Sequence, residues 1–542
     1  MLRVHRSGLA LAVVVFALLV GSTGCTSFHD YLHNGFKVGP NYCKPEAPVA
    51  KHWIDQSDLR QGPPENLSRW WTALNDSKLD YLIQCAYQQN LTLREAGFRI
   101  LQARALRGIA VGELFPQTQQ AFGQYTRSAA SVPPGSDLGK FSSNWQSGFT
   151  LNWELDFWGK FRRLIAEADA NLDAKVEGYD QVLVTLLGDV AQSYVQVRTD
   201  QQRIELLRAN VELQRGVLQF IENRFKAGFR QTELDLDQAV SNLRQTEAAI
   251  PALESDMRQA ENQLCVLLGM PPTALDEMLG AGPIPSVPPE IAVGIPADLL
   301  RQRPDVRQAE RLAAAQAEEI GIAQADLYPT FTIRGNLGYA AQNFPDLFRY
   351  SSFGGDVGPR FDWNVLNYGR IVNKVRYQNA LFQELAVTYQ QTVLQAANEV
   401  ENGVVTFLRS QQRSKLLDES VVAAQSAVKI VILQYEKGAV DFNRYALIQQ
   451  NLVTQQDSAT QAHGQIAQGL IQVYRALGGG WEIRLGGEEA APDEPPAVPE
   501  SKEQVPAPIP EAPKVHEDIP PPPADAVKVP EPEKLPEPDV KP

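Results

Sequence analysis

The chain has 542 residues and a formal net charge of −14, a balance that argues against nucleic acid as a partner. The spacing of its four cysteines indicates neither a disulfide framework nor a metal cluster, and its six histidines form no HExxH motif. No G-x-S-x-G or P-loop string occurs either, so we expect no enzyme activity, no cofactor and no metal site.

The segment 1–24 has the features of a secretory signal. A basic start precedes an apolar run, Leu9–Val20, and small residues follow it. The run is shorter than the roughly 20 residues of a membrane-spanning helix, although a membrane anchor or a buried core helix is the alternative. Cys25 comes next, so the segment resembles a bacterial lipoprotein signal, with Ser22 where those signals usually have Leu. Cys25 is therefore the predicted site of acyl chains such as palmitate, and Thr26 after it resembles sorting to the outer membrane.

Composition and repeat divide the chain into five predicted parts. They are a signal peptide (1–24), a lipidated leader (25–75), a first repeat (76–295), a second repeat (296–481) and a Pro/Glu-rich tail (482–542). From Pro492 onward, 17 of 51 residues are proline, and 12 acidic residues against five lysines give a net charge of −7. Such a segment cannot bury a core and is predicted to be disordered or polyproline-like. It could bind a periplasmic partner or the cell wall, or have no partner.

Each repeat is predicted to begin with helices. In the first repeat the helical region runs from Asp76 to Phe115, with a second helix capped by Thr92. The matching helix of the second repeat starts at Asp305, so the offset between the repeats there is 305 − 92 = 213. A proline then ends the helix and opens a strand region in both repeats, at Pro116 and Pro329.

A stretch in which a strand leads directly into a long helix then occurs twice. Leu151–Gly159 reads LNWELDFWG, and Phe361–Gly369 reads FDWNVLNYG, at an offset of 361 − 151 = 210. Gly159 and Gly369 are predicted to make the bends between strand and helix.

Four strands are predicted, two in each repeat, and polar and apolar residues alternate clearly in all but the first. They lie near 117–127, in 144–157, in 331–339 and in 353–365. One polar and one apolar face fit either a half-buried sheet in a soluble sandwich or a barrel with one face in lipid. Lengths of about ten residues and aromatic apolar faces favour the barrel. The faces that end in Trp153 and Trp363 are then expected to lie toward lipid or its interface.

Four strands are too few for a closed barrel, because small closed barrels have about eight. An open sheet in lipid would leave backbone groups without hydrogen bonds, at a cost of several kcal/mol each. If the sheet is in a membrane, the protein must therefore oligomerise.

The strand regions lead into exceptionally long predicted helices. Neither 160–250 nor 370–480 contains a proline, and about 65 helical residues would extend about 100 Å. Gly228 and Gly438 provide helix-ending signals, so each region is predicted to fold back as an antiparallel coiled-coil hairpin. Pro251 is expected to kink or locally unwind the first returning helix.

The offset of 210 also continues through the hairpins. It pairs Phe225 with Tyr435 before the tips, and the LLG at 267–269 with the LGG at 477–479 after the returning helices.

Four features together resemble the TolC/OprM family of outer-membrane efflux proteins over residues 38–481. They are Val38-Gly-Pro-Asn-Tyr42 with Lys44-Pro45, the RPDVRQAE stretch from Arg303, the duplicated strand-to-helix turn and the paired aromatic-x-x-Gly tips. The resemblance implies an α+β membrane protein and a homotrimer. Three chains of four β-strands would form a twelve-stranded outer-membrane β-barrel, and the helices a periplasmic α-barrel.

The function that this resemblance implies is a passive exit duct in a tripartite efflux or type I secretion system. A periplasmic adaptor and an inner-membrane pump would be its partners, and the pump and adaptor would largely select the cargo. The adaptor would dock at the hairpin tips, which by position are Ala227, Gly228, Phe229, Lys437, Gly438 and Ala439.

The resembled family closes its tube with inward carboxylates that follow the second tip. At the matching positions this chain has Arg444 and Leu447, neither of them acidic. We therefore expect closure by bulk and by Arg444, with an ordinary packing or solvated role as the alternative for each residue. The periplasmic gate candidates are Asp237, Asp441, Phe442, Arg444, Tyr445 and Leu447.

Three classes of function are compatible with the sequence. The leading one is a lipid-anchored outer-membrane duct with a periplasmic helical tube. A non-conducting envelope coiled coil or adhesin is the second, and an enzyme on a lipoprotein anchor is the third, without a catalytic constellation to support it.

Overall fold

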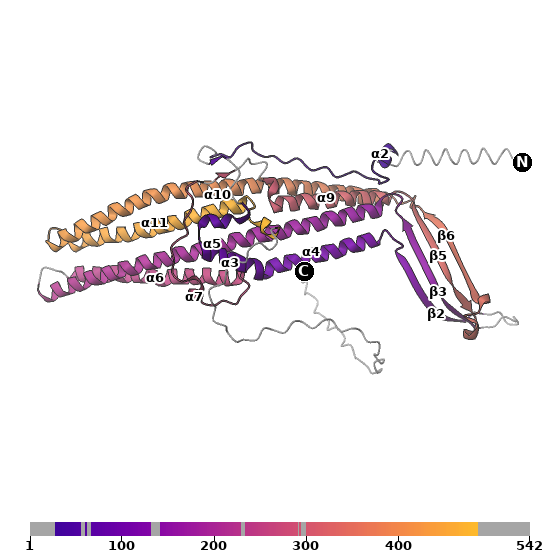
Figure 1. Cartoon of the computed structure of the whole chain (residues 1–542), viewed down its shortest axis with the longest axis horizontal. Helices are drawn as coiled ribbons and strands as arrows, with labels where there is room; N and C mark the ends of the chain where they lie inside the picture. Colours follow the sequence, from indigo (N-terminus) through magenta and orange to yellow (C-terminus); the bar gives the residue numbers. More distant parts are fainter. Residues whose placement is uncertain are drawn as a thin grey trace, which may run out of the picture. The chain divides into compact units, whose positions relative to one another are not determined.

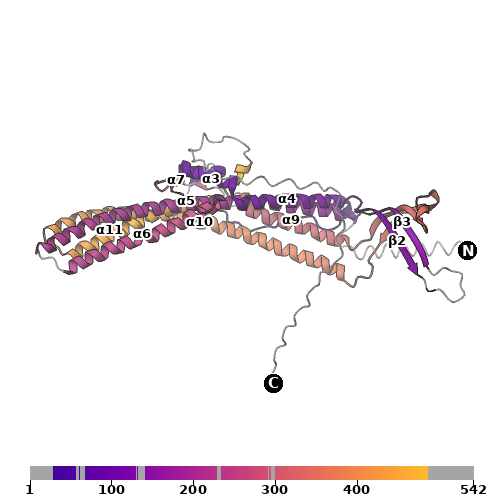
Figure 2. The same ribbon diagram turned by 90° about the horizontal axis from the view of Figure 1, so that it is seen from below.

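The computed structural model describes residues 28–55, 60–61, 67–129, 131, 141–228, 233–290, 292–293 and 300–485. Cys25, Phe229 and the tail from Pro492 lie outside these residues. The described part has all four long strands at one end, and two helical hairpins extend away from them (Figure 1; Figure 2).

The two halves of the chain contain the same elements in the same order. The first half has α4 (Leu91–Gly112), β2 (Thr118–Ala129), β3 (Phe141–Leu155), α5 (Lys160–Lys226) and α6 (Glu233–Leu267). The second half has α9 (Pro304–Ala325), β5 (Thr330–Ala341), β6 (Phe353–Asp362), α10 (Arg370–Glu436) and α11 (Phe442–Ala476). Because α5 and α10 both have 67 residues and α6 and α11 both have 35, the predicted internal duplication is confirmed.

Shorter elements complete the described structure. They are α2 (Phe28–His33), β1 (Arg60–Gln61), η2 (Leu67–Leu74), α3 (Ser77–Gln89), α7 (Asp276–Leu279), β4 (Ala292–Val293), η3 (Phe344–Asp346), η4 (Tyr350–Ser352) and η5 (Trp481–Arg484). The cap of α4 is Asn90, whose side chain accepts the Leu93 N–H at 2.8 Å. The predicted cap at Thr92 is therefore two residues late.

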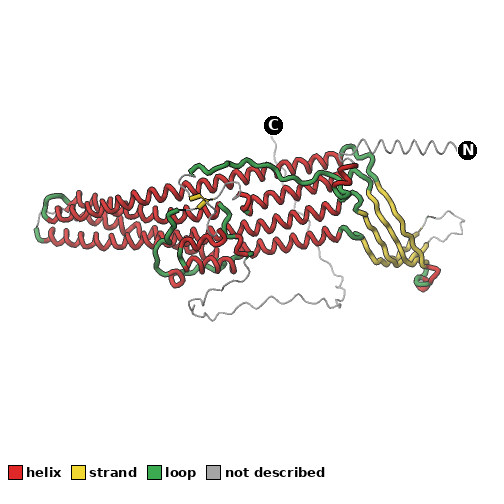
Figure 3. Tube along the Cα trace, turned by 45° about the horizontal axis from the view of Figure 1, so that its top comes forward, coloured by secondary structure: helices red, strands yellow, loops and turns green. Residues whose placement is uncertain are grey.

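The four long strands form one antiparallel sheet in the order β2-β3-β5-β6. Odd-numbered residues of every strand share one face, since Tyr125 lies opposite Trp145 and Phe149 opposite Leu337. Neither face is covered by a described helix (Figure 3), and Val357 and Phe361 of β6 are 72% and 66% exposed. A soluble sandwich would cover one face, so the exposed faces contradict that alternative.

The long helices pair as the two predicted hairpins, α5 with α6 and α10 with α11 (Figure 1). At 1.5 Å per residue, 67 residues extend about 100 Å. The returning helix α6 continues through Pro251 without interruption, so of the kink or local unwinding predicted there, the unwinding does not occur. No described helix has the length and hydropathy needed to cross a membrane.

The ends of the returning helices correct the alignment of the two halves. Left-handed glycines follow both helices, Gly269 with φ 72° and Gly478 with φ 75°. Their offset is 478 − 269 = 209, so pairing 267–269 with 477–479 at an offset of 210 is wrong by one position. The second half is therefore one position shorter between its tip and the end of its returning helix.

Two tryptophans make the same contact at the junction of sheet and helices. The indole N–H of Trp153 donates to the Leu114 carbonyl at 3.2 Å, and that of Trp363 donates to the Leu327 carbonyl at 3.0 Å. Both side chains are partly buried, and their N–H groups tie the end of each hairpin of strands to the turn that follows the preceding helix. A position of these residues toward lipid or its interface stays a prediction, and β6 ends at Asp362, before Trp363.

The predicted bends lie where the long helices begin. Gly159 has φ 79° and Gly369 has φ 77°, the left-handed conformation that a side chain disfavours. Their surroundings differ, because a Cβ on Gly159 would lie 2.8 Å from the Lys37 Cα. A Cβ on Gly369 would meet only the Asn373 Nδ2, at 3.7 Å.

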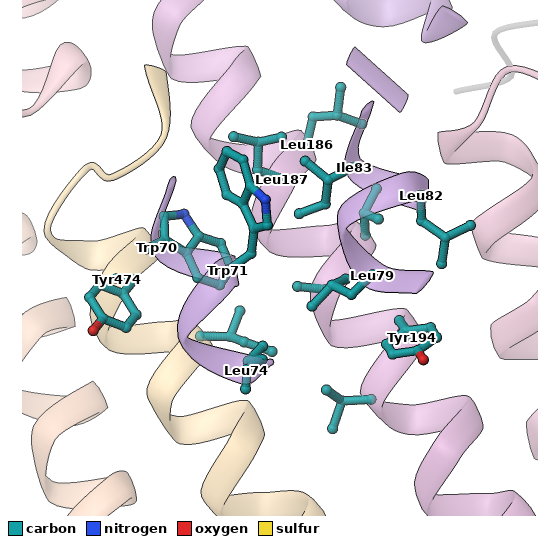
Figure 4. Close-up of a cluster of buried hydrophobic side chains, with 14 of the residues drawn as sticks. Trp70, Trp71, Leu74, Leu79, Leu82, Ile83, Leu186, Leu187, Tyr194 and Tyr474 are labelled. Atoms are coloured by element: carbon teal, nitrogen blue, oxygen red, sulfur yellow. The ribbon is translucent and has the colours of Figure 1, made fainter. Parts of the chain in front are cut away.

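The main hydrophobic core gathers side chains of η2, α3, α5 and α11 (Figure 4). Trp70 of η2 stacks on Tyr474 of α11, with ring centroids 5.6 Å apart, and its neighbour Trp71 is also buried. The Tyr194 hydroxyl donates to the Asp76 carboxylate at 2.6 Å and accepts from Arg198 at 2.9 Å. Burial raises the pKa of Tyr194, so the hydroxyl stays protonated as a donor. The leader and both halves therefore share one core.

We expect Gly159→Ala to destabilise the fold more than Gly369→Ala. Either substitution introduces left-handed strain of about 1–2 kcal/mol, but only Gly159→Ala also pushes against the Lys37 backbone. Denaturant unfolding of the detergent-solubilised protein, followed by circular dichroism, measures both changes. Equal losses would contradict the close approach of the leader to Gly159.

Candidate functional site: hairpin tips and the contacts between hairpins

Both hairpin tips turn on a left-handed glycine. Gly228 has φ 76° and Gly438 has φ 71°. At the second tip the Ala439 N–H donates to the Gln434 carbonyl at 2.8 Å, and the Gly438 N–H donates to the Tyr435 carbonyl at 2.9 Å. This pair of bonds is the Schellman ending of a helix.

The tip residues are solvent-exposed on the chain. Ala227 and Gly228 are exposed at the first tip, and Lys437, Gly438 and Ala439 at the second. Phe229, the remaining predicted tip residue, lies outside the described residues. A docking protein would thus find small side chains and one lysine at the described tip positions.

Asp441 has a structural role in addition to its charge. Its side chain caps α11 and accepts the Arg444 N–H at 2.9 Å. A carboxylate at this position stabilises the positive end of the helix dipole. The presence of Asp441 after the tip is therefore accounted for by the start of α11.

Phe442 and Tyr445 are buried rather than directed into open space. They are 3% and 5% exposed and pack with Tyr435 at ring-centroid distances of 5.7 and 6.1 Å. Ile221 of α5 belongs to the same cluster, and burial raises the pKa of Tyr445 to about 12. The prediction that these two rings close a lumen by their bulk is not supported, because the rings join the two hairpins.

The other gate candidates remain exposed on the chain. Leu447 is 62% exposed, and Arg444 and Asp237 are also exposed. Arg444 lies one helical turn before Leu447, so the two side chains share one side of α11. Nearby, Gln238 of the first hairpin donates to Asn443 of the second at 3.1 Å.

Polar contacts continue between the hairpins toward the central core. Arg203 of α5 makes a two-pronged ion pair with Asp457 of α11, at 2.7 and 3.1 Å. Farther toward the tips, Asn210 donates to Gln456 at 3.0 Å and accepts from Gln449 at 3.4 Å. These contacts link α5 of the first half of the chain to α11 of the second half.

The ion pair of Arg203 with Asp457 is partly buried. Asp200, which is fully buried, accepts from Arg203 at 3.3 Å and from Gln196 at 2.8 Å. Burial raises the pKa of Asp200. Burial would lower the pKa of Arg203, but the bonds and charges of Asp457 and Asp200 together raise it.

Sequence reasoning missed these contacts because no short motif carries them. Arg203 and Asp457 are 254 positions apart, and each lies in a helix with many similar charges. No group of His, Cys, Asp or Glu among the described residues has the geometry to hold a metal ion. Polar side chains therefore join α5 of the first hairpin to α11 of the second.

Comparison with known proteins identifies this architecture. The sequence model of the family described as outer membrane efflux protein matches residues 82–270 and 295–479. The pyoverdine export outer membrane protein OpmQ of Pseudomonas aeruginosa is 30% identical, over 79% of this chain and 89% of its own length. Nodulation protein T of Rhizobium leguminosarum bv. trifolii is 29% identical, over 84% of this chain and 97% of its own length.

Solved structures agree in fold. The outer-membrane channel OprN superposes with a TM-score of 0.78 at 28% identity, over 82% of this chain and 99% of that one. The open-state MtrE channel of Neisseria gonorrhoeae gives 0.72 at 20% identity, over 82% and 98%, which shows the fold alone. The predicted fold class, with strands for a trimeric barrel and helices for a periplasmic tube, is confirmed. The chain belongs to the outer membrane efflux protein family and is an outer-membrane exit duct of the tripartite type.

Proposed function

We propose that three copies of this chain form a lipid-anchored duct whose hairpin tips bind a periplasmic adaptor and whose hairpin contacts keep it closed. The evidence that supports assembly comes from the sheet. Its apolar face is exposed, and β2 and β6 are edge strands. In lipid, unpaired edges are unfavourable by several kcal/mol per group, and three sheets of four strands provide enough strands to close.

The leader supports a lipid anchor at the membrane end. The Tyr31 hydroxyl donates to the Phe157 carbonyl at 2.8 Å, and the Val38 N–H donates to the Trp158 carbonyl at 3.0 Å. These bonds hold the leader at the base of the sheet. Cys25 precedes Phe28 by three residues, a reach of about 10 Å, so its acyl chains would enter the membrane next to the strands.

The tips support the docking role by their position and exposure. They lie at the opposite end of the hairpins from the sheet (Figure 1), which is the periplasmic end if the sheet spans the outer membrane. Their turns expose backbone and small side chains, so an adaptor can approach both tips closely.

The contacts between hairpins support the closed state. Opening a tube at its tips requires neighbouring helices to separate or slide. The pair of Arg203 with Asp457 and the bonds of Asn210 join the two hairpins of each chain. An adaptor that binds the tips more tightly when the hairpins are apart would shift the population toward the open duct.

The cargo is selected outside this chain in our proposal. Relatives of nearly equal identity have names that refer to pyoverdine export, solvent efflux and toluene efflux. A wide duct that excludes little would serve any of these, so the pump and adaptor would determine the exported molecule.

We expect Asp457→Asn to raise single-channel conductance in planar bilayers several-fold. The substitution removes the charge that holds Arg203 and leaves the volume of the side chain unchanged. Glu254→Gln is the matched control, because Glu254 pairs with Arg208 at 2.7 Å within the first hairpin alone. An equal effect of both variants would contradict the role of the Arg203–Asp457 pair in keeping the duct closed. The absence of a channel in every variant would contradict the duct itself.

Arg444→Ala is expected to change conductance or the preference for cations over anions, because it removes an exposed positive charge near the tip. Arg444→Lys keeps the charge and should behave like the parent protein. Reversal potentials in a salt gradient give the ion preference. Unchanged values for Arg444→Ala would remove this residue from the lining of the duct.

Cys25→Ala is expected to abolish incorporation of labelled palmitate, because the acylated thiol is lost. Cys43→Ala is the control, since Cys43 is an exposed cysteine of the same leader. Palmitate labelling of the Cys25→Ala protein would rule out the anchor.

A further inference from the structure

We propose that α2 and the turn after it form a direct contact with the inner leaflet of the outer membrane, in which Leu32 and Phe36 enter the layer of acyl chains. The contact adds two side chains of the leader to the acyl anchor proposed at Cys25. It rests on the position of the sheet in the outer membrane, which a separate label in the experiment tests.

The short helix α2 has two exposed sides of opposite character. It lies where the strands meet the long helices (Figure 1), and its buried Tyr31 faces the rest of the protein. At 3.6 residues per turn, Asp30 and Leu32 lie on roughly opposite sides of the helix. Leu32 is 45% exposed, and the charged Asp30 is exposed as well. The exposed part of α2 is therefore amphipathic, as in helices that lie on a membrane surface.

The turn after α2 holds a phenylalanine outward in an unfavourable backbone conformation. The Phe36 N–H donates to the Tyr31 carbonyl at 2.9 Å, and the Gly35 N–H donates to the Leu32 carbonyl at 3.2 Å, which is a Schellman ending. Phe36 then has φ 60°, which a bulky residue rarely adopts. Its side chain is 54% exposed. A strained residue whose ring is exposed points to a contact outside the single chain.

An arginine of α5 fixes this turn in place. The Arg162 guanidinium donates to the Gly35 carbonyl at 2.5 Å and to the Phe36 carbonyl at 2.8 Å. Asp156, at the end of the sheet, accepts from the same guanidinium at 2.7 Å. The exposed Phe36 is therefore mounted rigidly on the segment that joins β3 to α5.

A series of ring contacts connects the apolar face of the sheet to Phe36. Phe331, an odd-numbered residue of β5, has its ring centroid 5.2 Å from that of Phe157. Phe157 lies 4.8 Å from Trp158, which lies 5.6 Å from Tyr31. Tyr31 in turn lies 5.6 Å from Phe36. The apolar surface of the sheet therefore continues onto the leader.

The membrane is the occupant that this position favours. The predicted acylation site, Cys25, precedes Phe28 by only three residues, so its acyl chains and α2 reach the same leaflet. Apolar side chains beside a lipid anchor bury further area in that leaflet, and aromatic rings are common at the boundary between acyl chains and headgroups. Such a contact would fix the height of the junction between strands and helices relative to the leaflet.

The test measures the membrane depth of single fluorescent labels. Leu32→Cys and Asp30→Cys each carry one polarity-sensitive dye, in a chain in which Cys43 and Cys85 are replaced by serine. Cys265 is buried, and the chain without an added cysteine gives the background. The protein is reconstituted in vesicles of phosphatidylethanolamine and phosphatidylglycerol. Lipids with a nitroxide high on the acyl chain should quench the label at position 32 several-fold more than that at position 30, and aqueous iodide should show the reverse order.

A glycine at position 36 tests the part played by the ring. Glycine accepts the left-handed backbone there, so Phe36→Gly removes the ring without adding strain. In the labelled Leu32→Cys protein this change should lower quenching by the nitroxide lipid about two-fold, because α2 moves toward water. Unchanged quenching would overturn the contact at Phe36.

A label at Leu337→Cys shows whether the sheet itself is in lipid, because Leu337 is a 56% exposed residue on the apolar face of β5. Lipid quenching at position 337 but not at position 32 would overturn the contact and leave the duct intact. A lack of quenching at both would also reject the membrane position of the sheet. Protection of the label at position 32 from both quenchers would show that protein covers α2, such as another copy, and would likewise overturn the contact with the leaflet.

Discussion

The structure depends on a four-stranded sheet that would not be stable in the outer membrane as a single copy. Its four strands have two unpaired edges, and its apolar face is exposed along residues such as Phe149, Val357 and Phe361. In water this face would aggregate, and in lipid the edges would lack hydrogen bonds. Lipid covers the apolar face and pairing with further copies satisfies the edges, so assembly follows from the chemistry of the backbone.

The two helical hairpins, which belong to the same internal repeat, must pack against each other along their length. Where the two hairpins pack side by side, some of their charged and amide side chains find partners between them. Arg203 with Asp457 and the amides around Asn210 supply such partners. These contacts are polar and partly exposed, so separating them is less unfavourable than separating an apolar core. Toward the tips the buried cluster of Ile221, Tyr435, Phe442 and Tyr445 also joins the hairpins, so opening there separates apolar contacts as well as polar ones.

Much of this architecture could be predicted from the sequence, because the repeat, the strand alternation and the helix-ending glycines are local signals. Contacts distant in sequence could not be predicted. Trp153 and Trp363 fit an aromatic lipid face by pattern, yet their indole N–H groups bind carbonyls of the preceding loops. Phe442 and Tyr445 lie where a gate was expected, but packing against Tyr435 buries them. Position in a repeat indicates the neighbourhood of a side chain, and only packing determines its direction.

The central claim is that both edges of the sheet are paired in the membrane. Amide hydrogen exchange of the protein in outer-membrane vesicles tests it directly, with peptides from β2 and β6 compared with those from the inner strands β3 and β5. A closed barrel predicts slow exchange in all four strands. Fast exchange confined to β2 and β6, with protection of β3 and β5 retained, would show open edges and contradict a closed barrel.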